Sequence, residues 1–448
     1  MSIVDIIISK FKLSPNRELI AKNVIWSLMG KVITLLGNLF VGIIIARYLG
    51  AEKYGLMNYV ISYVTLFQII ASFGLDNIEI REEAKADVKP EVVIGTAFRI
   101  RIIFSIITVF VTIVTSCIFE ADSETIILVA VYTFSIVAKS MDVIRNRFTS
   151  LVQNEYVVKS EISRTIIGVC IKLILLWLKA DIVIFVAAMA FDFVLLAAGY
   201  LVSYKSQIGK ISQWKYDSKY AKYLLKEAFP LLLTSAAVFV YQRIDQVMIG
   251  NLVDKEAVGY FATASRFVEI LMFFPQILTH TISPILIRIR KDDVNAYQNK
   301  AKMFMNITLW GMMILAIVLS ISAYWIIMLT FGDKYIQAVP ILAVLSFKVV
   351  AFALSTTAGS ILVLEGLQKW SIIRDLFGCI VCVLLNFIFL PKYGAIAAAY
   401  IAIASLICAG YIGDAIVPAY HHIFKWQTNA IIKGWMDLVH IKTFIKRK

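Results

Sequence analysis

Residues 23–46, NVIWSLMGKVITLLGNLFVGIIIA, decide the class of this protein because they hold a single charged residue, Lys31. At 1.5 Å per residue, a helix of this length spans about 36 Å, which exceeds the roughly 30 Å of a bilayer's hydrocarbon core. The stretch therefore predicts a transmembrane helix.

The rest of the 448-residue chain repeats this pattern. It is 60% hydrophobic and 17% charged, with a mean hydropathy of +0.81, which is more apolar surface than a water-soluble fold could bury. Apolar stretches of span length occupy residues 23–46, 56–73, 102–119, 126–143, 162–178, 182–203, 228–252, 258–286, 303–331, 336–364, 371–390 and 394–417. We expect an all-α polytopic membrane protein with about twelve transmembrane helices in two six-helix lobes.

The lysines and arginines are distributed unevenly between alternate loops. If the N-terminus is cytoplasmic, 32 of the 44 basic residues lie on the cytoplasmic side, six lie on the other side and six lie inside spans. By the positive-inside rule, this bias predicts two cytoplasmic termini in the cytoplasmic membrane of a bacterium. The net charge of +14 follows the membrane pattern and does not indicate a nucleic-acid partner. Residues 1–22 lack the apolar core of a signal peptide, so the first span is expected to direct insertion.

A long basic and aromatic break divides the spans six and six. The predicted organisation is an N-terminal lobe at residues 1–203, a cytoplasmic basic linker at residues 204–222, a C-terminal lobe at residues 223–418 and a cytoplasmic basic tail at residues 419–448. A weak repeat supports two halves, because the loops after the first and seventh spans both combine acidic and basic residues with a glycine, Gly55 or Gly259. Six spans per half make the repeats parallel, as in transporters whose substrate path lies between the halves.

The basic tail has the pattern of an amphipathic helix. Ile431, Trp435, Val439 and Ile445 recur near helical spacing among basic residues. Such a helix is expected to lie on the anionic inner leaflet, and a disordered tail is the alternative.

The basic residues inside the predicted spans are Lys31, Lys139, Lys172, Arg243, Arg266 and Lys348. Each costs about 2.5 to 3.5 kcal/mol at the centre of a membrane helix, so each needs a polar environment. Lys139 and Lys172 are near span ends and are expected to extend to the interface. Lys31 and Asn38 share one face of the first span, which we expect to face water. Hydrogen bonding between helices is the alternative role for Asn38.

The charged residues of the seventh and eighth spans form the main candidate site. Arg266 and Glu269 are close enough on one helix to neutralise each other, whereas Arg243 and Asp245 point in different directions. Arg243 and Arg266 lie at a similar expected depth, about 12 Å below the outer surface. Two interpretations remain open: a closed salt-bridge cluster, or a cationic cavity for a phosphate-bearing or other anionic substrate. The predicted substrate-pathway residues are Lys31, Asn38, Arg243, Asp245, Arg266, Glu269 and Lys348.

No metal, cofactor or catalytic site is predicted. Cys379 and Cys382 form a C-x-x-C inside an apolar stretch, but without a second pair or a nearby histidine they are expected to pack in the bundle. The sequence has no G-x-x-x-x-G-K-[ST] motif, so energy is expected from a proton or sodium gradient, the substrate gradient or a partner. The outer loops are too short for a catalytic domain, and we do not expect an enzyme.

The seventh and eighth spans carry recognisable motifs: DQVMIG at residues 245–250, VGYFATASR at residues 258–266, and Pro284. ARYLG at residues 46–50 and PKYGAIAAA at residues 391–399 agree with the same pattern. Together they resemble the Wzx family of polysaccharide (O-antigen) flippases, in the superfamily that also holds multidrug and toxin extruders and lipid II flippases. The resemblance implies that the chain moves an undecaprenyl-pyrophosphate-linked oligosaccharide, as in lipopolysaccharide biosynthesis, from the cytoplasmic to the outer face by alternating access of two lobes.

The resemblance also implies partners and leaves alternatives. A polysaccharide polymerase and a chain-length regulator are expected partners, besides membrane lipids. Lipid II flippases usually have two further spans that form a lipid groove, for which this chain has no room. The alternatives are a cation-coupled small-molecule exporter, in which acidic residues would dominate the cavity, and a non-transporting membrane assembly protein.

Reporter fusions test the expected orientation. A fusion at Lys210 should report the cytoplasm and a fusion at Lys334 the outer side, because the charge bias places these loops on opposite faces. A paired alkaline phosphatase and fluorescent protein reporter measures the side at each position. Matching signals at both positions would overturn the topology.

Overall fold

The computed structural model describes residues 15–85, 87–120 and 122–439, and within these ranges it is helical without a β-strand. The first half contains α2 (Pro15–Ser72), α3 (Leu75–Lys85), α4 (Pro90–Phe119), α5 (Ser123–Ala138), α6 (Asp142–Ser150), α7 (Asn154–Trp177) and α8 (Ile182–Gln207). The second half contains α9 (Ser218–Leu252), α10 (Lys255–Asp292), α11 (Val294–Ile321), α12 (Ala323–Thr330), α13 (Ala338–Leu345), α14 (Lys348–Glu365), α15 (Ser371–Tyr393), α16 (Ala395–Ile407), α17 (Gly413–Ile416), α18 (His421–Lys433) and α19 (Trp435–Val439). Short turns join them, namely the 3₁₀ turns η1 (Lys139–Met141), η2 (Ile211–Gln213), η3 (Asp333–Tyr335), η4 (Gln368–Trp370) and η6 (Pro418–Tyr420) and the π-helical turn η5 (Cys408–Ile412).

Nine helical stretches of the described residues are long and apolar enough to cross a membrane. The first of them, Lys22–Lys85, contains two arms of α2 that meet at Gly50, where φ is 77° and only glycine is unstrained. Two further helices have the length of a span: α9, which is bent, and α7, whose apolar part carries Glu161, Arg164 and Lys172. Counting the two arms of α2 separately and adding α9 and α7 gives twelve, so the expected all-α polytopic fold is confirmed.

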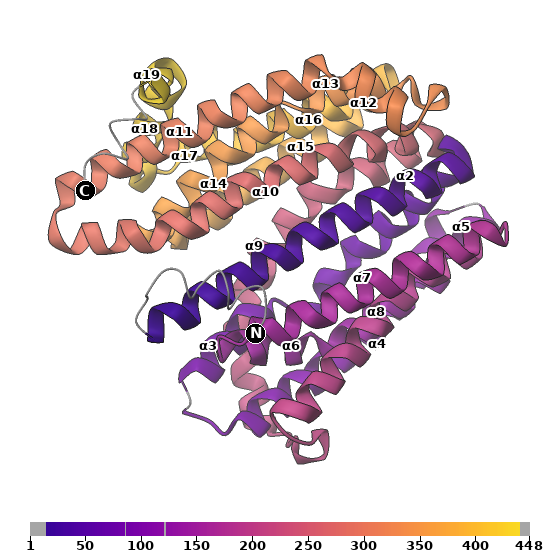
Figure 1. Cartoon of the computed structure of the whole chain (residues 1–448), viewed down its shortest axis with the longest axis horizontal. Helices are drawn as coiled ribbons and strands as arrows, with labels where there is room; N and C mark the ends of the chain where they lie inside the picture. The colour runs from indigo at the N-terminus through magenta and orange to yellow at the C-terminus, as the bar shows by residue number, and fades with distance from the viewer. Residues whose placement is uncertain (1–14, 86, 121, 440–448) are drawn as a thin grey trace. The chain divides into compact units, whose positions relative to one another are not determined.

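The helices form two compact units. Unit 1 comprises Met1–Leu49 and Val60–Ser235, and unit 2 comprises Gly50–Tyr59 and Ala236–Lys448. In the colour scale of Figure 1, unit 1 is mostly indigo to magenta and unit 2 mostly salmon to yellow. The division falls inside α9, and a short segment of the first half belongs to unit 2. The domain boundaries expected from the sequence, with a linker at residues 204–222, stay a prediction.

Partnered charges hold together the end of unit 1 that the charge bias places in the cytoplasm. Arg101 of α4, which is buried, donates to Glu79 Oε1 at 2.7 Å and to Asp76 Oδ1 at 2.8 Å, and both acids belong to α3. Asn146 of α6 donates to the second oxygen of Glu79 at 2.6 Å. Removing one partner would leave a buried charge uncompensated, at a cost of about 3 to 5 kcal/mol, so the cluster fixes α3 against α4 and α6. Buried apolar residues pack beside it, among them Leu75, Ile94, Ala97, Ile144 and Phe148.

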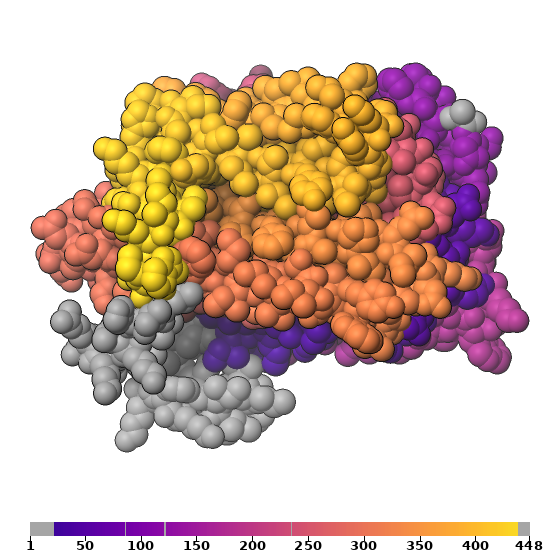
Figure 2. Space-filling view, turned by 90° about the horizontal axis from the view of Figure 1, so that it is seen from above, coloured from indigo at the N-terminus to yellow at the C-terminus, as the bar shows by residue number. Residues whose placement is uncertain are grey.

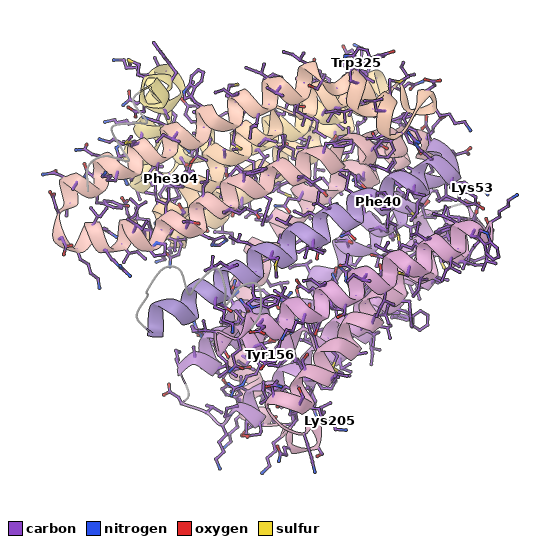
Figure 3. All side chains as sticks on the ribbon, viewed as in Figure 1. Phe40, Lys53, Tyr156, Lys205, Phe304 and Trp325 are labelled. Carbon is purple, nitrogen blue, oxygen red and sulfur yellow. The ribbon has the colours of Figure 1, made fainter. Side chains whose placement is uncertain are left out.

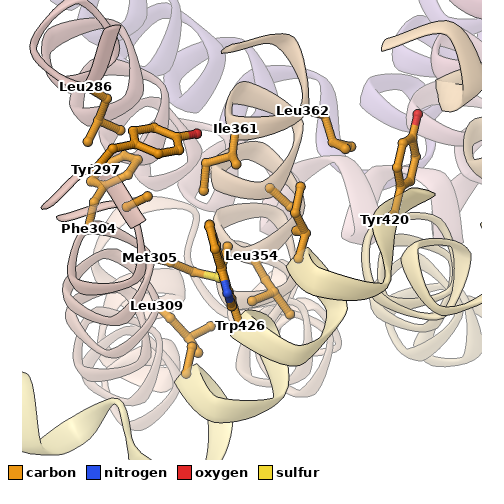
Figure 4. Packing of buried hydrophobic residues seen from close by; sticks show 14 of the residues in the cluster. Leu286, Tyr297, Phe304, Met305, Leu309, Leu354, Ile361, Leu362, Tyr420 and Trp426 are labelled. Atoms are coloured by element: carbon orange, nitrogen blue, oxygen red, sulfur yellow. The ribbon is translucent and has the colours of Figure 1, made fainter. Parts of the chain in front are cut away.

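The helix α18 is an integral part of unit 2. Its apolar face is buried against α11 and α14, where Trp426 packs in the same cluster as Met305 and Leu354 (Figure 4). Trp310 Nε1 donates to the carbonyl of Ala430 at 2.8 Å. The start of the tail is therefore docked on unit 2.

The other face of the tail remains exposed. Ile431 and Trp435, two of the residues expected on the amphipathic face, are about half exposed. The side chain of Val439 and the whole of Ile445 lie outside what the structure describes. Contact of this face with the inner leaflet stays a prediction.

Large apolar side chains also cover the outside of both units. Phe40 and Trp325, labelled in Figure 3, are 57% and 67% exposed, and Phe119 and Trp177 are more exposed still. Figure 2 shows one face of unit 2, where the segments coloured orange to yellow pack closely. A surface with so many large exposed apolar groups requires hydrocarbon around it, as expected for a multi-pass membrane protein.

The segment Gly50–Tyr59 packs on α10 without room for a side chain. A Cβ at Gly55 would lie 1.7 Å from the carbonyl oxygen of Lys255, and a Cβ at Gly259 would lie 2.2 Å from that of Ala51. The two glycines of the weak repeat therefore meet at one helix crossing. Small residues allow membrane helices to approach this closely.

Substitution at this crossing should destabilise the protein. We expect Gly259→Ala to cost about 1 to 3 kcal/mol or to prevent folding, because the added Cβ meets backbone that cannot rotate away. Gly311→Ala is the matched control, since a Cβ there meets nothing within 4 Å and alanine favours a helix. Melting of both variants in detergent measures the difference. Equal melting temperatures would show that the crossing relaxes freely.

Candidate functional site

Asp245 of α9 is buried in the interior of unit 2. Its Oδ1 accepts a hydrogen bond from Asn386 Nδ2 at 2.9 Å and from Cys382 Sγ at 3.5 Å, both on α15. Its Oδ2 and the Oδ1 of Asn386 are also buried, and neither has a hydrogen-bond partner among the described residues. Leaving polar oxygens unpaired in an apolar interior is unfavourable. The pair is therefore suited to accept a proton or a small cation.

The residues around Asp245 restrict which ion could bind. The described part of the chain has no group of three or more His, Cys, Asp and Glu side chains placed to hold a metal. Oxygen donors without thiolate or imidazole suit hard cations better than zinc or copper. Lys348, the first residue of α14, interacts electrostatically with Asp245 and offsets part of its charge.

Glu269 interacts electrostatically with Arg266, but it forms its ion pair with another arginine. Glu269 forms its ion pair with Arg243 of the preceding helix, with 3.3 Å between Oε1 and Nη1, and both side chains are partly exposed. Arg266 instead donates through Nε to the hydroxyl of Tyr54 at 3.1 Å. The segment containing Tyr54 packs beside α10 and brings its hydroxyl within hydrogen-bond distance of Arg266. Asp245 and Arg243 have different partners, Asn386 and Glu269 respectively.

The guanidinium group of Arg266 has hydrogen-bond donors that are not bonded to any residue the structure describes. Its one hydrogen bond within the described residues leaves both Nη groups without a protein acceptor. Its partner, Tyr54, is fully buried and is a neutral hydroxyl that does not cancel the charge. Tyr54 and Tyr260 both pack edge to face against Tyr335, which fixes the position of the hydroxyl. The arrangement presents a positioned guanidinium that could bind two oxygens of an anion.

The remaining predicted pathway residues, Lys31 and Asn38, belong to unit 1. Both side chains are exposed on the first arm of α2. Lys31 interacts electrostatically with Glu161 of α7. The structure thus brings Arg243 to Glu269 and Lys348 to Asp245 within unit 2, and places the two α2 residues in the other unit.

Lys172 does not extend to the interface, contrary to the expectation. It is 6% exposed, and its Nζ donates to Asp192 Oδ2 on α8. Gly168 provides the space, since a Cβ there would lie 2.3 Å from the other oxygen of Asp192. A carboxylate on the neighbouring helix satisfies the ammonium group without moving it to water. Lys139 is half-buried, with its Nζ 4.7 Å from the ring centre of Phe193.

Three partners were not identified from the sequence: Tyr54, Asp192 and Asn386. Asp192 and Asn386 are isolated polar residues in otherwise apolar stretches, and this isolation was the available signal. Tyr54 gave no such signal, because it lies in a loop motif far from Arg266 in the sequence. Asp192 and Asn386 both pair with a charged residue on another helix.

Comparison with known proteins identifies a family whose model matches this chain. The family model described as "Polysaccharide biosynthesis protein" matches residues 20–290. A search of the curated proteins found no match. The resemblance expected from the motifs is thereby supported by a family model that spans the first half of the chain and the start of the second.

Solved structures share the fold. A lipid II flippase MurJ in an inward closed conformation matches with a TM-score of 0.68 and 16% identity over 92% of each chain. A multidrug resistance MATE family transporter of the MOP superfamily, in an inward-facing conformation, matches with a TM-score of 0.62 and 14% identity over 87% of this chain and 96% of that chain. A MOP superfamily transporter from Pyrococcus furiosus matches with a TM-score of 0.59 and 13% identity over 92% of this chain and 95% of that chain. Identities this low establish the fold alone.

Removing the charge of Asp245 tests whether the unpartnered oxygens bind a cation. Purified protein should melt at a higher temperature in sodium chloride than in choline chloride, because a ligand at ten times its Kd adds about 1.4 kcal/mol to the folded state. Asp245→Asn should lose this difference. If the ligand is a proton, the native protein should melt at different temperatures in acidic and alkaline choline buffers. Asp245→Asn should lose that difference.

The matched control is Asp254→Asn, at the N-cap of α10, where asparagine caps as well as aspartate. It should keep the response of the native protein. A native protein that melts alike in all four conditions would contradict a cation or proton site at Asp245.

Proposed function

This chain belongs to the polysaccharide biosynthesis protein family, and from that premise we propose that it is a flippase for an undecaprenyl-pyrophosphate-linked oligosaccharide. The cargo would be the repeat unit of an O-antigen or a related surface polysaccharide, moved from the cytoplasmic to the outer face of a bacterial inner membrane. Alternating access would open the substrate path to one side at a time.

The observation that carries this proposal is the unused hydrogen-bonding capacity of Arg266. A guanidinium inside a span is costly, and a closed salt-bridge cluster would give it a carboxylate partner. Its hydrogen-bond partner is the neutral hydroxyl of Tyr54, Glu269 interacts with it only electrostatically, and its Nη groups make no hydrogen bond with the described residues. A phosphate group supplies the missing acceptors in a geometry that guanidinium matches.

The need for cations follows from the cargo. An isolated ion loses tens of kcal/mol of solvation in an apolar medium by Born estimates, so a pyrophosphate requires replacement contacts on its way. Arg243, Arg266 and Lys348 lie on three different helices of unit 2. Cations that are separated in this way bind the anion less tightly than one dense cluster would. The anion can therefore move on from each of them.

A cation-coupled exporter of small molecules is the second candidate function. The observation that favours it is Asp245, whose unpartnered oxygen could couple an ion to transport. Coupling of this kind is equally compatible with a flippase driven by a proton or sodium gradient. A non-transporting assembly role has no comparable feature among the described residues. For the flippase, we expect a polysaccharide polymerase and a chain-length regulator as partners.

Complementation of a flippase-null strain tests the function. Arg266→Ala should restore about tenfold less surface polysaccharide per molecule of inserted protein than the native chain, since a charge-assisted hydrogen bond contributes about 1.5 to 3 kcal/mol. Arg243→Ala and Lys348→Ala should act in the same direction. Arg288→Ala, at an exposed position near the end of α10, is the control and should complement fully.

The outcome also separates the two candidates. If the Arg266, Arg243 and Lys348 variants all insert normally and restore full polysaccharide, the cationic mechanism is wrong. If the native chain does not complement but lowers drug sensitivity in a strain without exporters, the second candidate replaces the first.

A further inference from the structure

Residues 208–217, here called the inner strap, join α8 to α9 and are docked on unit 1. Trp214 Nε1 donates to the hydroxyl of Tyr204 at 2.9 Å. The backbone N–H of Lys215 donates to the carbonyl of Glu91 at 3.0 Å. The strap is thus held to the rest of unit 1 by both a side chain and its backbone.

The fit against α4 is close. A Cβ at Gly95 would lie 2.5 Å from the carbonyl oxygen and 2.6 Å from the nitrogen of Lys215, so only glycine leaves room for the strap. The guanidinium of Arg99 lies 5.0 Å from the ring centre of Tyr216. The side chains of this segment therefore project from a fixed backbone, and binding a partner does not require the backbone to be ordered as well.

The strap and its flanking turns carry a band of exposed lysines. The basic band consists of Lys205, Lys210, Lys215, Lys219, Lys222 and Lys226. None of the six forms an ion pair with a residue that the structure describes. Two nearby acids are already engaged, because Asp217 accepts from the N–H of Tyr220 at 2.9 Å and Glu227 pairs with Arg81 at 2.8 Å. The charge of the band is left for an external partner.

Apolar side chains are interleaved with the lysines. Ile211, Tyr216 and Tyr223 are each roughly two-fifths exposed within this stretch. Tyrosine, with an apolar ring and a polar tip, is favoured at the boundary between lipid and water. Lys205 lies in the last turn of α8, near the end of that helix (Figure 3). The band therefore begins where a membrane span ends, on the face that the charge bias places in the cytoplasm.

We propose that the inner strap and its basic band bind the headgroups of anionic phospholipids in the cytoplasmic leaflet. Lysines next to a span are attracted to the negative surface of that leaflet. The shape of the band argues for several headgroups and against one diphosphate. A single diphosphate is held best by converging guanidinium groups that each bind two oxygens, whereas these ammonium groups are separate point charges along a strap.

Lipid quenching of a probe on the strap tests this surface. Ser212→Cys, labelled with bimane in a chain whose native cysteines have been replaced and whose folding has been verified by melting, is reconstituted into vesicles. The vesicles contain brominated phosphatidylglycerol or brominated phosphatidylcholine at equal bromine content. Quenching by the anionic lipid should exceed quenching by the zwitterionic lipid about threefold or more.

Two triple variants with the same loss of charge give the comparison. Lys210→Gln, Lys215→Gln and Lys219→Gln together should bring the ratio close to one. Lys179→Gln, Lys334→Gln and Lys392→Gln remove three exposed lysines from the opposite loops and should leave it unchanged. Equal ratios for the two triple variants would contradict the proposal.

Other occupants of the strap give distinct results. Undecaprenyl pyrophosphate added at a low mole fraction should not change the quenching ratio. If it abolishes the preference, the band holds the cargo and the proposal is overturned. If neither brominated lipid quenches the probe, the strap faces water or a protein, and the proposal is equally overturned. The readout is lipid contact and not export, so its failure leaves the proposed flippase function untouched.

Discussion

A charge buried in an apolar interior needs a partner, and this requirement organises both units. In unit 1, Lys172 is satisfied by Asp192 on the next helix. In unit 2, Nη1 of Arg374 on α15 lies 3.3 Å from Oδ1 of Asp414 on α17, and both side chains are buried. Each pair ties two helices together, because separating them would expose an uncompensated charge to the interior.

Two charged groups differ from these closed pairs because part of their hydrogen-bonding capacity is unused. Arg266 has a neutral partner, and Asp245 has one oxygen that accepts nothing from the described residues. Groups of this kind are unfavourable for stability. This cost is consistent with the proposal that Arg266 binds a substrate and Asp245 binds an ion. The contrast separates charges that are paired within the bundle from charges that have unused hydrogen-bonding capacity.

The number and class of the helices could be predicted from the sequence, because the thickness of a bilayer fixes the length of an apolar stretch. The positions of costly charges could be predicted for the same reason. Their partners could not, since Tyr54 is 212 residues away from Arg266 and pairing depends on which helices are neighbours. Periodicity describes one helix at a time. Asp192 could have been paired with Lys172 only once α7 and α8 were known to pack together.

The assignment of Gly50–Tyr59 to unit 2 affects how the protein is made. Gly55 leaves the ribosome about 200 residues before Gly259, its partner at the helix crossing, and at about 5 to 20 residues per second that is a delay of about 10 to 40 seconds. During this interval the first membrane helices stand without a neighbour that they will later touch. A C-terminal half synthesised alone would lack a piece of its own interior. The two halves of the polypeptide are thus not two independent folding units, and the nascent chain depends on α10 to complete a contact begun by α2.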